Sequence, residues 1–267
     1  MKKLILGLAI GSCGLMSTQI ALADGYARPV SIKDVGARCA SFHGLYFGAN
    51  VGAGYLDHTW SDRDAWAKNE VDPALPSSVN GTENGWLGGI QGGFNWQKGC
   101  TLFGFEADWS WTNLEQTNIH TDGQPGLALD RLRVTRDVNS FGTLRTRTGV
   151  VVDSLLLFAT GGLAWAKMDS SWAVTDFRGG SFVTETFGTS DTRWGWTAGV
   201  GTEWALAPNI SIKSEALYLK FTDNDSAFNS AFAVQNGSPA IKRFDEQDAM
   251  WVARIGVNYR FGCGSAC

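Results

Sequence analysis

The sequence predicts an all-β protein, an eight-stranded antiparallel up-and-down β-barrel that spans a membrane. In residues 249–261 every second side chain is apolar, and this apolar face ends on Tyr259 and Phe261. Side chains alternate between faces along a strand, and aromatic residues at the edge of an apolar face are typical of the girdle of a membrane barrel. About eight segments of roughly a dozen residues show such a pattern, joined by alternately short and long connections. A soluble β-sandwich would not need that regular rhythm.

The composition agrees with this fold class. The chain has 267 residues, with 33 Gly and 12 Trp but only 6 Pro, which suits crowded, curved strands with aromatic girdles. No internal stretch approaches the roughly 20 apolar residues of a membrane helix. The formal net charge is −4 and there is no basic cluster, so we expect no nucleic-acid partner.

The first residues have the pattern of an export signal. Two lysines and an apolar stretch precede the sequence Ala21-Leu22-Ala23, an A-x-A cleavage site. We therefore predict a signal peptide over residues 1–23, cleaved between Ala23 and Asp24. Lipidation at Cys13 is the less favoured alternative, because only a very short apolar run precedes it.

An N-terminal leader segment, residues 24–43, comes next, and the barrel follows over residues 44–261. Its first four strands are expected at about 44–55, 85–97, 101–112 and 140–151. The third is the clearest, since Phe103, Phe105 and Trp109 alternate with Gly104, Glu106 and Asp108. In the fourth, Leu144 and Val150 stand on the face opposite Arg145 and Arg147.

The last four strands are expected at about 155–168, 191–206, 210–221 and 249–261. Residues 155–168 are apolar on both faces, so their pattern does not show which face meets lipid. In the sixth strand, Trp194, Trp196 and Val200 are expected to point outward and Glu203 inward. In the seventh, Ile212, Ala216 and Tyr218 alternate with Lys213 and Glu215.

The connections fall into two classes. Three short turns are expected at 98–100, 152–154 and 207–209, and four polar loops of about 22 to 28 residues at 57–84, 113–138, 169–190 and 222–248. This is the asymmetry of periplasmic turns and external loops in outer-membrane barrels. The acidic stretch 222–226 could bind a divalent cation, but it lacks the Gly and distal Glu of a complete calcium loop, so a solvated turn is favoured.

Four cysteines remain after the signal peptide: Cys39, Cys100, Cys263 and Cys267. Strand parity places all four at the periplasmic end, an oxidising compartment in which disulfides are expected. Four cysteines allow three connectivities, of which Cys39–Cys100 with Cys263–Cys267 is one. We find no metal or cofactor motif and predict neither.

Several segments resemble the alphaproteobacterial family of small outer-membrane barrels, often called porin-like, and more broadly the OmpA-type transmembrane domain. They are GLYFGANVG (44–52), GGIQGGFN (88–95), FGFEAD (103–108), RTRTG (145–149) and YRF (259–261). The resemblance covers the strands and implies location in the outer membrane of a Gram-negative bacterium. It says little about activity, since one barrel scaffold hosts many functions.

One feature departs from that family. Its members usually end on the terminal Phe, which resembles a signal for the outer-membrane insertion machinery. Here a Cys-containing tail, residues 262–267, follows Phe261. The resemblance also implies two partners, the insertion machinery and the lipid and lipopolysaccharide of the outer membrane.

Charged side chains on the inward faces form the sharpest candidate site. The expected members of this interior charge network are Glu106, Asp108, Arg145, Arg147, Glu203, Lys213, Glu215, Arg254 and Arg260. Opposite charges on paired strands are close enough to bond, and an eight-stranded barrel is just wide enough to be filled by side chains. We therefore favour a plugged structural barrel that supports envelope integrity and displays surface loops whose ligand is unknown. A small diffusion pore with a charge-lined lumen is the alternative.

An enzyme at the external rim is the least favoured hypothesis, and we predict no catalytic residues. His58 beside Asp57, and His120 near Asp122, are expected in loops where a catalytic dyad could form. However, no Ser or Cys nucleophile motif is present, and solvated loop histidines are the ordinary interpretation.

Overall fold

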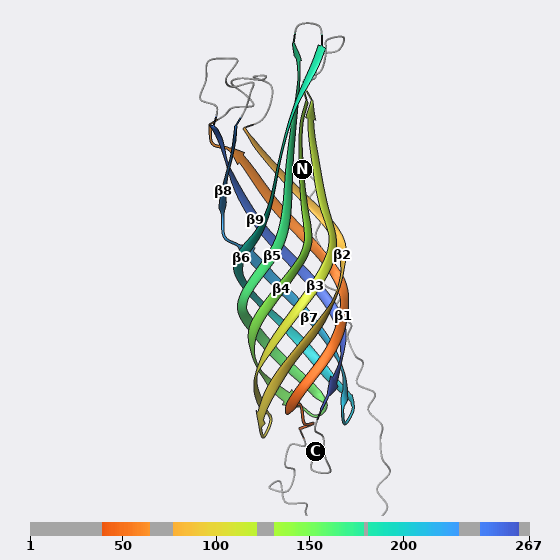
Figure 1. Cartoon of the computed structure of the whole chain (residues 1–267). Helices are drawn as coiled ribbons and strands as arrows, with labels where there is room; N and C mark the ends of the chain where they lie inside the picture. The colour runs from red at the N-terminus through yellow and green to blue at the C-terminus, as the bar shows by residue number, and fades with distance from the viewer. Residues whose placement is uncertain (1–38, 65–76, 122–130, 179–180, 230–240, 262–267) are drawn as a thin grey trace, which may run out of the picture. The chain divides into compact units, whose positions relative to one another are not determined.

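A computed structural model describes residues 39–64, 77–121, 131–178, 181–229 and 241–261. Within these ranges the chain forms one antiparallel sheet of nine strands (Figure 1). The strands are β1 (Gly44–Asp62), β2 (Ser78–Lys98), β3 (Thr101–Thr121), β4 (Arg131–Val152), β5 (Leu155–Arg178), β6 (Ser181–Ala207), β7 (Ile210–Phe221), β8 (Asn224–Asn229) and β9 (Ile241–Arg260). Among these residues, no helix has the length and hydrophobicity to span a membrane.

The sheet closes into a barrel because β9 pairs with β1 as well as with β7. Ala53 lies opposite Ala253 in the first ladder, and Ala216 lies opposite the same alanine in the second. Eight strands, β1 to β7 and β9, make the closed ring, while the short β8 pairs with β9 beyond the end of β7. The predicted eight-stranded antiparallel barrel is confirmed, and β8 is an additional strand within the stretch predicted as a long loop.

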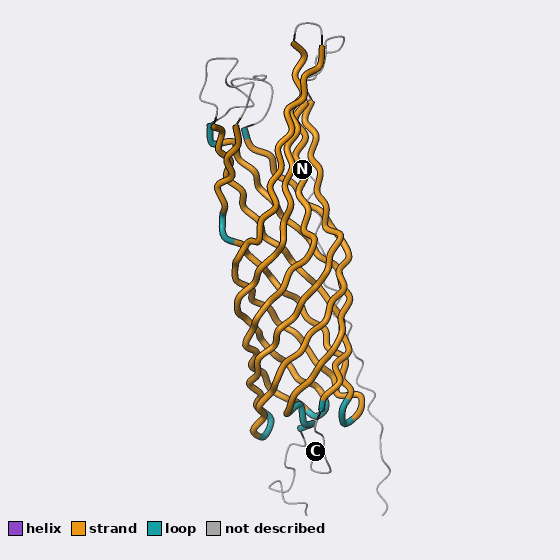
Figure 2. The backbone as a smooth tube through the Cα atoms, viewed as in Figure 1, coloured by secondary structure: helices purple, strands orange, loops and turns teal. Residues whose placement is uncertain are grey.

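The short turns gather at one end of the barrel, as Figure 2 shows. We call this the periplasmic end, and the opposite end external, following the usual asymmetry of these barrels. A disulfide joins Cys39 to Cys100 there, with the two Cα atoms 5.4 Å apart. Cys263 and Cys267 lie outside the described residues, as do the signal peptide with its Ala23–Asp24 junction and most of the leader segment.

The strands are longer than the predicted dozen residues, and the predicted long loops are partly strand. β1 has 19 residues and β6 has 27. Asn80 and Gly81, in the stretch predicted as a polar loop, lie inside β2 opposite Thr59 and His58. The error has a physical cause, since the outward face of these extensions is polar and the apolar–polar contrast used to find strands reverses there.

The outward face of the ring carries an apolar band between two aromatic girdles, which we call the membrane belt. The external girdle contains Tyr55, Trp86, Trp111, Trp194 and Trp251, and the periplasmic girdle contains Trp96, Phe103, Trp204, Tyr259 and Phe261. Between the girdles, large apolar side chains project outward among smaller ones; Val51 is 62% exposed and Val200 63%. Such exposure suits lipid tails.

Beyond the external girdle the wall divides into two groups of strands. The β2–β3 ladder ends at Leu87 and Thr112, and the β6–β7 ladder ends at Gly195 and Phe221. The first external sheet comprises residues 114–121 of β3, 131–138 of β4, 168–178 of β5 and 181–193 of β6. The second comprises residues 56–62 of β1, 78–85 of β2, 241–250 of β9 and β8.

Candidate functional site in the barrel interior

A layer of ionic side chains fills the interior at the level of the membrane belt. Strand alternation turns them inward, and each is at most 6% exposed. The members are Glu106 and Asp108 from β3, Arg145 and Arg147 from β4, Glu203 from β6, Lys213 and Glu215 from β7, and Arg254 from β9. With four carboxylates and four cations, this belt network is balanced in formal charge.

Arg145 is the centre of the belt network. Its guanidinium contacts Glu106, lies 3.0 Å from Oδ2 of Asp108 and lies 3.0 Å from Oε2 of Glu215. The neighbouring Lys213 Nζ is 2.8 Å from Oε1 of Glu106. One arginine thus joins carboxylates from strands on different sides of the ring, which fixes the interior as a single unit.

The remaining pairs complete the network. Arg147 Nη1 lies 2.9 Å from Oε2 of Glu203. Arg254 bridges two acids, with Nη1 at 2.9 Å from Oδ1 of Asp108 and Nε at 2.6 Å from Oε1 of Glu215. Opposite charges held this closely, and also hydrogen-bonded, are the condition under which buried ions are tolerated.

Arg260 occupies a different place from the other predicted members. It is buried, but its guanidinium donates to the Pro208 carbonyl at 3.1 Å and lies 4.7 Å from the centre of the Phe42 ring. Phe42 belongs to an apolar cluster with Leu102 and Leu156 near the disulfide. Through these contacts Arg260 helps to close the periplasmic end.

Neutral side chains that the sequence interpretation did not single out satisfy the carboxylates of this network. Tyr46 donates from Oη to Glu106 at 2.6 Å, and Ser211 donates to Glu203 at 2.5 Å. Asn258 also donates to Glu203, at 3.0 Å, and accepts from Gln91 at 2.7 Å. All lie on inward faces, so strand parity could have identified them.

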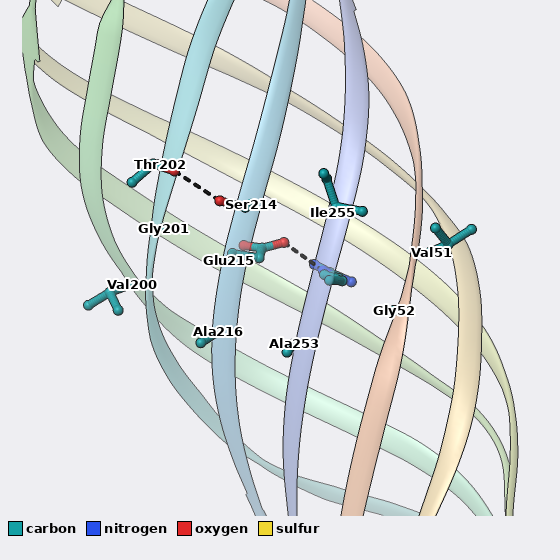
Figure 3. Close-up of a pocket in the computed structure, with 11 residues that line it drawn as sticks. Val51, Gly52, Val200, Gly201, Thr202, Ser214, Glu215, Ala216, Ala253 and Ile255 are labelled. Atoms are coloured by element: carbon teal, nitrogen blue, oxygen red, sulfur yellow. Dashed lines mark hydrogen bonds and ion pairs between the residues drawn. The ribbon is translucent and has the colours of Figure 1, made fainter. Parts of the chain in front are cut away.

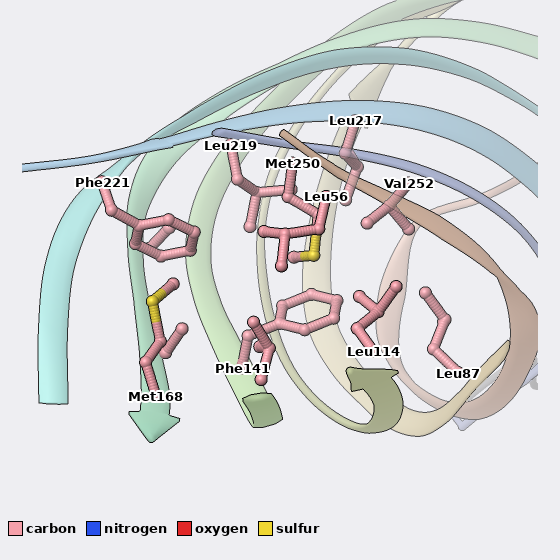
Figure 4. Packing of buried hydrophobic residues seen from close by; sticks show 13 residues of the cluster. Leu56, Leu87, Leu114, Phe141, Met168, Leu217, Leu219, Phe221, Met250 and Val252 are labelled. Carbon is pink, nitrogen blue, oxygen red and sulfur yellow. The ribbon is translucent and has the colours of Figure 1, made fainter. Parts of the chain in front are cut away.

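An apolar layer lies on the external side of the belt network (Figure 4). Its members are Leu56, Leu87, Leu114, Val138, Phe141, Ala164, Ala166, Met168, Leu217, Leu219, Phe221, Met250 and Val252. They come from every strand of the ring except β6 and are almost wholly buried. This apolar layer separates the belt network from a second group of charges.

The second group, which we call the external cluster, contains Arg136, Arg193, Glu246, Asp248 and His58. Arg136 lies 3.2 Å from Glu246 and also pairs with Asp248. Arg193 pairs with Glu246 and lies 3.0 Å from Asp248. This cluster was not predicted, because all its residues except Arg193 fall in stretches interpreted as loops. Arg193 lies at the start of the predicted sixth strand but was not assigned to a site.

His58 corrects one prediction. It was expected in a solvated loop, but it is 3% exposed, and its Nδ1 lies 2.6 Å from Oδ1 of Asp248. Its position in β1, three residues beyond the girdle residue Tyr55, turns it inward. His120 lies in β3, opposite Leu132 of β4, and not in a loop. The expectation that His58 lies exposed in a loop at the external rim is therefore wrong.

Asp248 lies beyond the external girdle, outside the membrane belt. Burial alone would raise the pKa of its carboxyl group. The hydrogen bond with His58 and the charges of Arg136 and Arg193 outweigh burial and hold this pKa below its ordinary value. Asp248 therefore stays ionised at neutral pH, as the ion pairs of the external cluster require.

Several shallow depressions lie on the lipid-facing side of the barrel. One is floored by small residues such as Gly52, Gly201, Ala216 and Ala253. Figure 3 shows it, with Glu215 and its ion pair close to the floor. Within the described ranges, no group of three or more acidic, His or Cys side chains could hold a metal ion. Chemically, the interior offers layers of neutralised charge and packed hydrocarbon.

Known proteins resemble this chain in sequence. The family model described as outer membrane protein beta-barrel domain matches residues 36–261. The 31 kDa outer-membrane immunogenic protein of Brucella melitensis is 30% identical over 225 residues, covering 83% of this chain and 84% of the relative. The 25 kDa outer-membrane immunogenic protein of Brucella canis is 24% identical over 209 residues, covering 78% and 76%.

Solved barrels resemble the fold more distantly. The outer membrane protease OmpT from Escherichia coli has 9% sequence identity and a TM-score of 0.44, covering 81% of this chain and 97% of that structure. A likeness at this level carries no argument about activity. The alphaproteobacterial relatives and the family model confirm the predicted family and location. The chain is an outer-membrane protein and belongs to the outer membrane β-barrel domain family.

Proposed function

We propose that this protein is a plugged structural barrel that supports envelope integrity and displays its external strands and loops at the cell surface. The observation that carries the proposal is the filled interior. From the periplasmic end outward, an apolar cluster around Phe42, the belt network, the apolar layer and the external cluster follow one another. An ion crossing the barrel would have to displace both packed hydrocarbon and paired charges.

Surface display is supported by the relatives. The Brucella proteins are named outer-membrane immunogenic proteins, which accords with external segments that antibodies can reach. Lipopolysaccharide is the partner proposed for the outer face. Lys167 and Lys220 project outward next to girdle tryptophans and could meet its phosphates. The insertion machinery remains the partner proposed for assembly.

Planar-bilayer recording tests the plugged interior. Refolded mature protein is expected to give no steady conductance steps at neutral pH. The matched control removes part of the apolar layer by Phe141→Ala with Phe221→Ala, leaving both charged groups in place, and shows whether such an opening can be detected. Steady, reproducible conductance of the unmodified protein would overturn the proposal in favour of a pore.

The structural role is tested in cells. Deleting the gene is expected to increase sensitivity to detergents, and re-expressed protein carrying the paired alanine substitutions should restore resistance only partly. If the deletion left detergent and antibiotic sensitivity unchanged, the envelope-integrity part of the proposal would be wrong.

A further inference from the structure

The two external sheets are not joined to each other by backbone ladders within the described residues. On one side the β2–β3 ladder stops at Leu87 and Thr112. On the other side the residues of β6 before Gly195 have no partner in β7, and the described pairing of β8 is with β9. The side chain of Asn113 accepts from the Trp86 amide at 2.7 Å, just where β2 and β3 part. Each sheet keeps its own internal ladders.

Charge is divided between the two sheets by sign. The first external sheet contributes Arg136 and Arg193 to the external cluster, and the second contributes Glu246 and Asp248. All four of these arginine–carboxylate contacts cross from one sheet to the other. Within its own sheet, Arg136 meets only neutral groups in the described contacts, such as the Met168 sulfur at 3.0 Å.

Aromatic rings make a second contact between the sheets. Phe244 of the second sheet stacks on Trp172 of the first, with ring centres 5.9 Å apart. Phe244 also stacks on Trp60 of its own sheet, with ring centres 4.7 Å apart. All three are buried. Among the described residues, the contacts between the two sheets are made by side chains, and no ladder hydrogen bond joins one sheet to the other.

We propose that the two external sheets form a clamp that opens as a unit, and that the external cluster holds it closed. The ring of strands at the level of the membrane belt does not open with the clamp, because each of its strands is joined to both neighbours by backbone ladders. Opening exposes the inner face of each sheet to water. A small sheet without a packed face is only marginally stable, so the ladder hydrogen bonds of the separated sheets should open at lower free energy than those of the ring. Glu246 and Asp248 face Arg136 from β4, Arg193 from β6, and His58 from β1, while Asp62 lies further along the inner face of β1.

Hydrogen exchange read by mass spectrometry tests the clamp in detergent micelles. In the variant Glu246→Gln with Asp248→Asn, amides in residues 131–138, 168–178 and 241–248 should exchange on the order of tenfold faster. Amides in residues 145–150 and 252–258 of the ring should change less than about twofold. The matched control is Asp245→Asn, which removes an exposed carboxylate paired with Arg63 on the opposite face of β9; it should leave both regions unchanged.

An equal acceleration in the ring and the external sheets would overturn the clamp, and so would no acceleration at all. A measurement on the unmodified chain covers the case in which the double variant does not fold. In graded urea, external amides should exchange through an opening with a smaller urea dependence than that of the ring amides. If both sets followed one common dependence at every urea concentration, the clamp would not exist as a separate unit.

Discussion

The membrane belt and the external half of this barrel use the same strands with opposite patterning. In the belt, Val51 and Ile255 face outward, while Arg145 and Arg254 face inward. In the external half, Trp60, Phe244 and Trp172 face inward and the outward positions carry hydroxyl and charged groups such as Thr117 and Thr135. The solvent outside decides the pattern, since lipid accepts hydrocarbon and water accepts polar groups.

The two regions also differ in how they are held together. The belt is closed by continuous ladders and filled by a charge-balanced network, whereas the external half consists of two sheets joined by side chains. A strand can therefore leave the membrane without ending. One type of substitution should accordingly have different effects in the two regions.

The largest expected effect is in the belt network. Arg145→Ala would leave Glu106, Asp108 and Glu215 without their shared cation. Stranding buried charges costs about 3–5 kcal/mol, so the free energy of unfolding should fall by that amount. Urea titration of the folded barrel in micelles measures it. A loss below about 1 kcal/mol would show that the interior is hydrated like a surface.

The next largest effect compares the outward surface of the membrane belt with the outward surface of the external half. Ile255→Arg places a cation on the lipid-facing side of the belt and should cost about 2–4 kcal/mol. Thr135→Arg, on the outward face of the first external sheet, should change stability by less than about 0.5 kcal/mol. Both variants are compared by the same urea titration, and equal losses would contradict the placement of the belt.

Acid should weaken the external half through Asp248. Because its folded-state pKa is depressed, its ionisation stabilises the fold above the ordinary Asp value of about 3.9 and that contribution is lost as pH falls below it. Between pH 5 and pH 2, the unmodified protein should lose more stability than Asp248→Asn. Parallel pH dependences of the two urea midpoints would show that Asp248 is not ion-paired.

The smallest effect belongs to the exposed pair of Arg63 and Asp245. Its side chains are 47% and 37% exposed, and exposed pairs contribute about 0–1 kcal/mol. Arg63→Ala should therefore lower the free energy of unfolding by no more than that. A loss as large as that of Arg145→Ala would contradict the distinction between the buried and exposed pairs.

The belt could be predicted from sequence and the external half could not. In β3, apolar residues at every second position from Phe103 to Trp111 alternate with polar residues such as Glu106 and Asp108. The period of two and the polarity of the side chains therefore predict the same strand and the same inward face. In β1, the pattern reverses after Leu56, and Asp57, Thr59 and Ser61 look like a loop although they are strand. Reading parity onward from Tyr55 would have placed His58 and Trp60 inside.

The candidate site divides in the same way. The strands that the sequence predicts correctly contain the inward charges of the belt network, and strand parity was enough to assign them to one interior group. Arg260 was assigned to the same group, but its described contacts lie at the periplasmic end. Arg136, Glu246 and Asp248 were missed because their strands extend into stretches that the polarity pattern assigns to loops. Arg193 lies at the start of a predicted strand, but its ion-pair partners were not recognised as inward-facing. The division of the wall into two sheets depends on where the ladders stop, and ladder ends are set by tertiary packing.

Spin-label accessibility along one strand tests the central claim most directly. Single cysteines at outward positions 133, 135, 137, 144, 148 and 150 of β4 would be labelled in lipid bilayers, with Cys263 and Cys267 replaced by serine. Positions 144, 148 and 150 should collide mainly with oxygen dissolved in lipid, and positions 133, 135 and 137 mainly with a water-soluble nickel reagent. The same preference at all six positions would contradict a strand that passes from lipid into water without ending.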